Sequence, residues 1–172
     1  MPDSGAAIAR TIQIQMTIMR LLYPAMILML SGAYAHAVDF RWTLGFAQGT
    51  LEAIIRNAGE SSVNIYCPSG QNDTTPGMFI DSARVKPKAK EQVTVQIIVD
   101  GTNHPFYLDE NQFLANGRAN RQSLEWLVHA LAASKARSFS VEFPKYKVAE
   151  QFSLLDVKRA IGLGRNSILA GC

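Results

Sequence analysis

Apolar and polar residues alternate with a period of two along several stretches of this 172-residue chain. The clearest stretch runs from Val93 to Val99, and a second runs from Val63 to Cys67. A period of two is typical of a β-strand that buries one face and leaves the other in water. The apolar face of such a strand must be covered by another layer, so the chain is expected to fold as a β-sheet domain around one core.

Further strand-like segments are separated by turn signals. The expected strands lie in 40–57, which holds two strands around a turn near Gly49, and in 63–67, 78–85, 93–99, 106–108, 139–143 and 147–152. The segment Asp100–Pro105, with the sequence DGTNHP, is predicted to form a hairpin turn between two of these strands. About eight short strands are therefore expected.

Two segments have helical periodicity instead. Leu124, Leu127, Val128 and Leu131 follow the i, i+3, i+4, i+7 spacing of one helix face. Asn120 or Ser123 is expected to cap this helix, and Arg121 is expected to pair with Glu125 one turn later.

A second, shorter helix is expected near the end of the chain. Ser153 and Asp156 resemble a capping box ahead of an apolar face that includes Val157 and Ile161, and Gly162 is expected to end the helix. The predicted fold is mainly β with α: an antiparallel β-sandwich or barrel of about eight strands with two helices.

The N-terminal part has the order of a secretory signal. Arg20 precedes the uncharged apolar run Leu21–Leu30, and Ala35 and Ala37 stand three residues and one residue before a cut at Val38. The predicted organisation is a signal peptide over 1–37 and a single disulfide-bonded, β-rich domain over 38–172. Location in the periplasm, or secretion, is the corresponding expectation.

Two alternatives concern this leader. The first is a membrane anchor, but the apolar run has ten residues and a spanning helix needs about 20. The second is a later start, because Met16 or Met19 would give a more compact signal than Met1 does. Membrane contact is therefore expected only through the signal peptide.

The chain has two cysteines, Cys67 and Cys172. In an oxidising compartment an even pair is usually bridged, so a disulfide between them is expected. Cys67 falls on the apolar side of the alternation with Val63 and Ile65, where a structural bridge would lie. The alternatives are two free thiols or a redox pair, and a redox pair would usually have C-x-x-C spacing.

The charge balance argues against a nucleic-acid partner. The formal net charge is +3 for the whole chain. The densest basic run contains Lys86, Lys88 and Lys90, and it is interpreted as a solvated loop or strand edge rather than a phosphate-binding patch.

No catalytic, cofactor-binding or metal-binding constellation is found in the sequence. His104 and His129 lack a second histidine or a cysteine at ligand spacing, so no metal site is expected. Asp109 and Glu110 would point to opposite faces of a strand, which prevents paired acid–base work. Ser123 and His129 are six residues apart on one expected helix and cannot meet.

Three other features are given structural interpretations. Trp42 and Trp126 are expected in the core. The glycines at 162 and 164 are interpreted as a helix end and not as a phosphate loop. The polar segment Pro68–Gly77 is expected to form a loop, and a loop of this length can carry recognition.

The ending FSLLDVKRAIGLGRNSILAGC, together with the signal and an earlier cysteine in a β region, resembles small exported proteins of the bacterial envelope. The nearest are the invasion-associated locus B family and the accessory periplasmic proteins of type VI secretion clusters. The resemblance implies a β-sandwich with Cys67 joined to Cys172, and a non-enzymatic role.

Two functional hypotheses follow. The first is a non-enzymatic interaction protein with another protein as partner, accessory to secretion or host contact. The second is an envelope inhibitor or immunity protein that blocks a hydrolase, with the loop Pro68–Gly77 as the segment that enters the cleft. An enzyme is the third class, and the sequence lacks the convergent polar groups that it would need.

Overall fold

The strands of this protein form one curved antiparallel sheet. The structure is a computed structural model that describes residues 40–69 and 75–172, which belong to the unit Asp39–Cys172. The described strands are β1 (Thr43–Ala47), β2 (Thr50–Arg56), β3 (Ser62–Pro68), β4 (Gly77–Asp81), β5 (Gln92–Val99), β6 (Thr102–Asp109), β7 (Gln112–Leu114), β8 (Ser138–Phe143) and β9 (Val148–Ser153). Their order in the sheet is β1-β2-β3-β4-β7-β6-β5-β8-β9.

Two α-helices and three short 3-10 helices complete the described part of the chain. They are α2 (Gly117–Ala133), α3 (Val157–Ile161), η1 (Pro144–Tyr146), η2 (Gly164–Asn166) and η3 (Ile168–Gly171). The expected mainly β fold with two helices is confirmed, and its antiparallel sheet is not closed. None of the described helices is long and apolar enough to cross a membrane.

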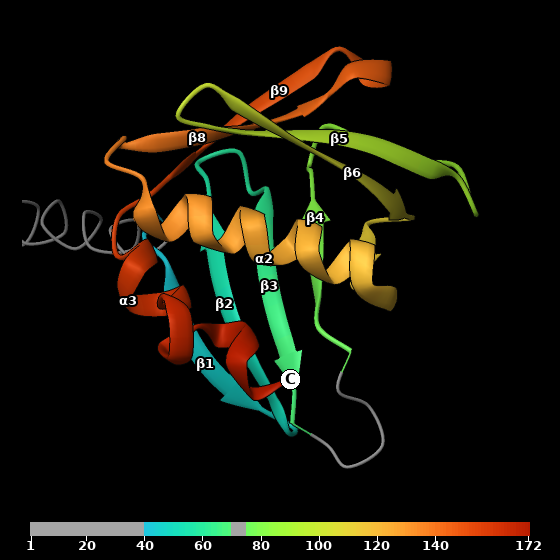
Figure 1. Cartoon of the computed structure of the whole chain (residues 1–172). Helices are drawn as coiled ribbons and strands as arrows, with labels where there is room; N and C mark the ends of the chain where they lie inside the picture. The colour runs from blue at the N-terminus through green and yellow to red at the C-terminus, as the bar shows by residue number, and fades with distance from the viewer. Residues whose placement is uncertain (1–39, 70–74) are drawn as a thin grey trace, which may run out of the picture. The chain divides into compact units, whose positions relative to one another are not determined.

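The core lies on the concave side of the sheet. Figure 1 shows β2, β3 and β4 running crosswise to β5, β6 and β8, with α2 lying against the sheet. The alternating residues that the sequence pattern picked out face inward: all four of Val93, Val95, Ile97 and Val99 are buried. They share one apolar cluster with the α2 residues Leu124, Leu127, Val128 and Leu131.

Trp42 connects the first described residues to the end of β9. Its side chain is 1% exposed and stacks on Phe139, and its indole N–H donates to the Ser153 carbonyl over 3.1 Å. Its backbone N–H donates to the Leu155 carbonyl over 3.0 Å. The predicted core position of Trp42 is confirmed, because the ring supplies apolar area and its N–H has a partner.

Trp126 is the opposite case. It was expected in the core, but its side chain is 61% exposed on α2. The buried face of α2 is formed by the residues with the i, i+3, i+4, i+7 spacing, and position 126 lies outside that set. The prediction for Trp126 was therefore wrong.

The hairpin between β5 and β6 is tighter than predicted. Only Asp100 and Gly101 form the turn, with positive φ angles of 50° and 78°. The segment Thr102–Pro105 belongs to β6 instead. A two-residue turn with both residues at positive φ matches the right-handed twist of the strands that it joins, which explains why a longer turn is not needed.

Three other boundaries also differ from the sequence-based predictions. The helix α2 begins after Asn116, and neither Asn120 nor Ser123 caps it; the Ser123 hydroxyl donates to the Ala119 carbonyl. The hydroxyl of Ser153 accepts from the Leu155 N–H and does not cap α3. The strand expected over 78–85 ends at Asp81 as β4, and β7 was not predicted.

Candidate functional site

The C-terminal tail is fixed to the sheet by a disulfide. Cys67 and Cys172 are bonded, with an S–S distance of 2.02 Å and a Cα–Cα distance of 5.7 Å, across 105 residues of sequence. Cys67 lies on the inward face of β3, as predicted, and is 2% exposed. Figure 1 shows the C-terminus beside one end of β3. The predicted bridge is confirmed.

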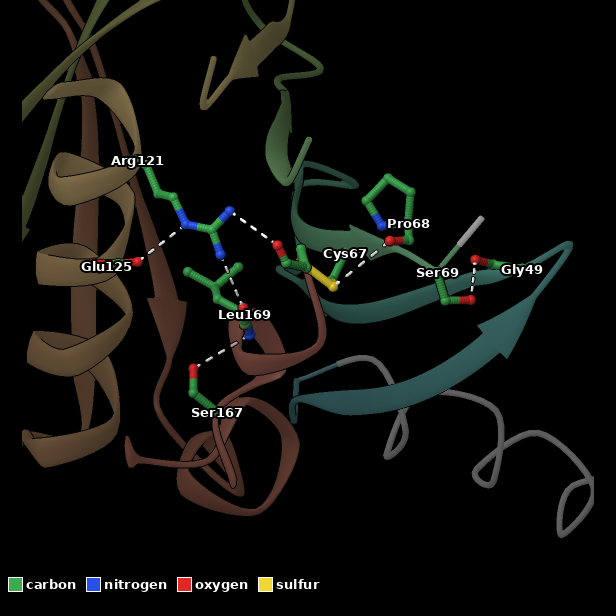
Figure 2. Close-up of a disulfide and its surroundings, with 9 residues drawn as sticks. Gly49, Cys67, Pro68, Ser69, Arg121, Glu125, Ser167 and Leu169 are labelled. Atoms are coloured by element: carbon green, nitrogen blue, oxygen red, sulfur yellow. Dashed lines mark hydrogen bonds and ion pairs between the residues drawn. A yellow bond between two sulfur atoms is a disulfide. The ribbon is translucent and has the colours of Figure 1, made fainter. Parts of the chain in front are cut away.

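Arg121 holds the same tail from the other side. In Figure 2 its guanidinium lies between α2 and the tail. It donates to the carbonyl oxygens of Cys172 and Leu169 over 3.1 and 3.3 Å, and to Glu125 over 3.2 Å. The predicted Arg121–Glu125 pair is thus present. A cleft of about 310 Å³ lies between α2 and the tail, and His129 is one of the residues that line it.

The convex face of the sheet carries a cluster of aromatic and amide side chains. Tyr66 stacks on Phe79, with ring centroids 5.2 Å apart, and the Gln112 side chain donates to the Tyr66 hydroxyl over 2.7 Å. Leu114 lies opposite Gly77, which pairs with Tyr66 on its other side. We call Tyr66, Phe79, Gln112 and Leu114 the outer-face cluster.

Exposure and rigidity distinguish the members of the outer-face cluster. Phe79 is 36% exposed and Leu114 is 43% exposed, whereas Tyr66 is buried. Gly77 makes this packing possible, because a Cβ at that position would lie 2.2 Å from the Tyr66 hydroxyl oxygen and 2.6 Å from the Phe113 carbonyl oxygen. The result is two exposed apolar side chains around a ring that is held in place.

The loop Pro68–Gly77 begins and ends at this cluster. Its first residue follows Cys67, and Gly77 is opposite Tyr66. Ser69 donates to the Gly49 carbonyl through both its N–H (2.7 Å) and its hydroxyl (2.6 Å). The Ala115 N–H donates to Pro76 over 2.9 Å. Both ends of the loop are therefore anchored, and residues 70–74 lie outside the described part of the chain.

A buried carboxylate lies on β9, the strand at one end of the sheet. Glu150 points inward from β9, where it is 5% exposed. It accepts from the Ser82 hydroxyl over 2.7 Å and from the Arg84 Nε over 3.3 Å. Arg84 also donates to the Ala149 carbonyl. This group links the residues after β4 to β9, so it fixes one edge of the open sheet.

The basic run predicted as a solvated loop lines a cleft of about 280 Å³ at one end of the sheet. Lys86 and Lys88 are exposed there, but Asp81 and Glu110 line the same cleft. The mixed signs of charge give no preference for an anion or a cation. The interpretation of the run as a solvated segment is consistent with this arrangement.

Glu91 follows the basic run and is held by three donors. It accepts from Lys145, from the Tyr146 hydroxyl over 2.8 Å and from the Lys88 N–H over 2.8 Å. The hydrogen bond from Lys145 is the main reason that the pKa of Glu91 falls to about 2, with the Lys88 and Tyr146 bonds as further causes. The same contact raises the pKa of Lys145. These bonds tie the segment 86–91 to η1, and they occupy both carboxylate oxygens of Glu91.

Comparison with known protein families decides the affiliation of the chain. The model of the YfjT family matches residues 40–161, which include every described strand and both α-helices. The chain belongs to the YfjT family. No curated protein matches this YfjT-family chain, and no solved structure matches it.

The predicted site residues of this YfjT-family chain do not converge. His104 lies within β6, facing the core, and burial lowers its pKa. His129 is exposed on α2, and Asp109 and Glu110 are exposed at the β6–β7 turn. Among the residues that the structure describes, no three histidine, cysteine or acidic side chains are grouped as a metal site would require. The expectation that the protein needs no metal or cofactor remains a prediction.

The predicted signal residues Ala35, Ala37 and Val38 lie outside the described residues. The expected cleavage site and the signal peptide over 1–37 therefore remain predictions.

Sequence reasoning missed the outer-face cluster and the Glu150 group. A signal existed for Glu150, because it takes the inward position between Val148 and Phe152 in the alternation of β9. An acidic residue at an inward position indicates a buried and partnered charge. No comparable signal existed for the outer-face cluster, because its members come from three strands whose pairing the sequence does not reveal.

Proposed function

We propose that this protein is a periplasmic or secreted component of the bacterial envelope, and that it acts by binding another protein rather than by catalysis. The observation that carries the proposal is the outer-face cluster. Phe79 and Leu114 offer apolar area to a partner, and the hydrogen bond from Gln112 keeps Tyr66 in one orientation. Aromatic side chains are enriched at the centres of protein interfaces, and a rigid ring loses little entropy on binding.

The disulfide supports the proposed location. Bridges between distant cysteines persist in oxidising compartments such as the periplasm. The Cys67–Cys172 bond closes 105 residues and joins two buried or partly buried positions. Together with the predicted cut before Val38, it favours export. An accessory role in secretion or host contact is the narrower form of the proposal and rests on the sequence resemblance.

Partner capture with matched variants tests the proposal. Phe79→Glu and Leu114→Glu each place a charge at the outer-face cluster, and Thr94→Glu places one on an exposed position of β5. We expect the wild type and Thr94→Glu to retain one stoichiometric partner from the periplasmic or secreted fraction, and both cluster variants to lose it. Equal retention by all four proteins would contradict a binding role for the cluster.

The second candidate is an inhibitor of an envelope hydrolase. The anchored ends of the loop Pro68–Gly77, described above, favour it, because a loop with fixed ends can enter a cleft at a small entropic cost. Replacing residues 70–74 with glycine and serine distinguishes the candidates. Loss of binding on loop replacement, with Phe79→Glu unaffected and the captured partner a hydrolase, would favour inhibition over the cluster.

A further inference from the structure

Among the described residues, the strand β1 is an edge strand without the usual protection against pairing. It stands at one end of the sheet order, and all five of its residues are exposed. Its sequence, TLGFA, has no charge and no proline. In natural proteins, pairing at an edge strand is commonly prevented by lysine, proline, a bulge or a covering segment, because the free N–H and C=O groups of the edge can bind another strand.

The other edge of the sheet provides a comparison within the same molecule. On β9, Arg84 donates to the Ala149 carbonyl, and the inward Glu150 binds Ser82 and Arg84. A charged side chain therefore occupies part of that edge. Within the part of the chain that the structure describes, β1 has no such cover.

The register of β1 shows which of its backbone groups face outward. Ala47 and Thr50 flank the two-residue turn at Gln48 and Gly49, which makes them a hydrogen-bonded pair in the ladder. Alternation then directs the N–H and C=O of Leu44 and Phe46 away from β2. Trp42 agrees with this alternation of outward-facing backbone groups, because its N–H points to the same edge and donates to the Leu155 carbonyl. The next two outward positions are those of Leu44 and Phe46.

The side chains of β1 add apolar area next to these groups. Leu44 is opposite Ala53 and Phe46 is opposite Leu51, so both side chains point to the core side of the sheet. Leu44 is 50% exposed and Phe46 is 66% exposed. A strand added at this edge would cover both side chains and extend the apolar face of the sheet.

We propose that β1 pairs with β1 of a second copy of this chain, in antiparallel register around Gly45, to form a two-fold dimer with a continuous sheet. The sequence is self-complementary in that register. Leu44 faces Phe46 of the second copy, Thr43 faces Ala47, and Gly45 faces Gly45. Aliphatic–aromatic pairs across strands are favourable, and the register brings no like charges together.

The residues that flank β1 fit the same arrangement. Arg41 is held by Asp156 at 2.6 Å and would lie opposite Gly49 of the second copy rather than opposite a charge. Leu155 occupies the edge at Trp42 and limits the pairing to residues 43–47. An interface of five residues a side is small, so the dimer is expected to be weak and to depend on concentration. This interface is separate from the outer-face cluster.

Sedimentation of the purified, oxidised protein from micromolar to millimolar concentration tests the dimer. We expect reversible dimerisation, which Phe46→Lys weakens roughly tenfold or more by placing an ammonium in the paired edge. Tyr107→Lys, which removes an exposed aromatic side chain from the convex face, is expected to dimerise like the wild type. A monomer at all concentrations, or Phe46→Lys dimerising like the wild type, would overturn the proposal.

A cysteine placed on β1 tests the register. A Cβ at Gly45 meets no atom within 4 Å, so Gly45→Cys fits the strand, and the two copies would bring these positions to about 4.5 Å. We expect Gly45→Cys to form a covalent dimer under mild oxidation. Ala47→Cys alone should not, but it should crosslink when mixed with Thr43→Cys. Crosslinking of Ala47→Cys as fast as that of Gly45→Cys would rule out this register.

Discussion

Glu91 shows how one carboxylate can make the stability of this fold depend on acid. Three donors, led by Lys145, favour its ionised form and hold its pKa at about 2, against an ordinary value of 4.5. In the unfolded chain these donors are lost. The contribution of Glu91 is therefore fully present above pH 4.5 and disappears as the pH falls towards 2.

The first prediction concerns Glu91→Gln. At pH 7 the variant should unfold at lower urea concentration than the wild type, and the difference should shrink between pH 4.5 and about 2. Urea titrations at a series of pH values measure this. Lys145→Met, which removes the main donor, should reproduce most of the effect. A difference that stays constant down to pH 2 would show that Glu91 has no linked proton in this window.

The second prediction concerns Gly77, where a Cβ would meet the Tyr66 hydroxyl and the Phe113 carbonyl. The Gly77→Ala variant should be less stable by about 1–3 kcal/mol, because a backbone carbonyl cannot move aside as a flexible side chain can. It should also weaken partner binding through the displaced Tyr66. Chemical denaturation and the capture experiment measure the two effects.

Gly45→Ala is the matched control for Gly77→Ala, since its added Cβ meets nothing within 4 Å. Its stability should stay within about 0.5 kcal/mol of the wild type. Equal losses in the two variants would contradict the account of Gly77, because they would show that the close packing of Tyr66 does not require glycine there.

At the scale of elements, the C-terminal tail is held by a covalent bond and by a guanidinium. The third prediction is that Cys67→Ser or Cys172→Ser lowers the free energy of unfolding by about 2–5 kcal/mol, the usual loss for a native disulfide of a small secreted domain. Replacing both cysteines should cost little more than replacing one, because they act as a unit. Denaturation curves of the three variants measure this, with thiol titration of the unfolded, unreduced protein to confirm the bridge.

Arg121 makes the test of the tail more specific. Arg121→Met removes the two hydrogen bonds to Leu169 and Cys172. Its cost should be smaller in the Cys172→Ser background than in the wild type, because a released tail no longer presents those carbonyls. Additive costs would indicate that the tail stays in place without the disulfide.

The elements differ in how well the sequence predicts them. β5 and α2 were predicted because each buries one face along its length. The buried residues of β5 recur every second position, and those of α2 recur every three or four positions. β7 has three residues, which is too short to show a period. The hairpin after β5 was misjudged because Asn103 and Pro105 have the residue types of a turn. Their places in β6 are set by pairing with β5, a tertiary effect that overrides local preference.

At the scale of the whole molecule, the fold class follows from the sequence but the site does not. The alternation predicts a sheet and a core, and the cysteine pair predicts the bridge. The pairing of β4 with β7 and of β5 with β8 brings together residues that are far apart in the chain. The outer-face cluster depends on the first of these pairings. No local pattern could therefore reveal that Gln112 bonds to Tyr66.

The proposed role of the protein rests on binding of a partner by the outer-face cluster in the envelope. Photo-crosslinking inside the producing cell, from a reactive amino acid at position 114, tests it most directly. We expect one adduct of defined mass from position 114, and none from the control positions 94 on β5 and 126 on α2. No adduct from position 114, or the same adducts from all three positions, would contradict the claim.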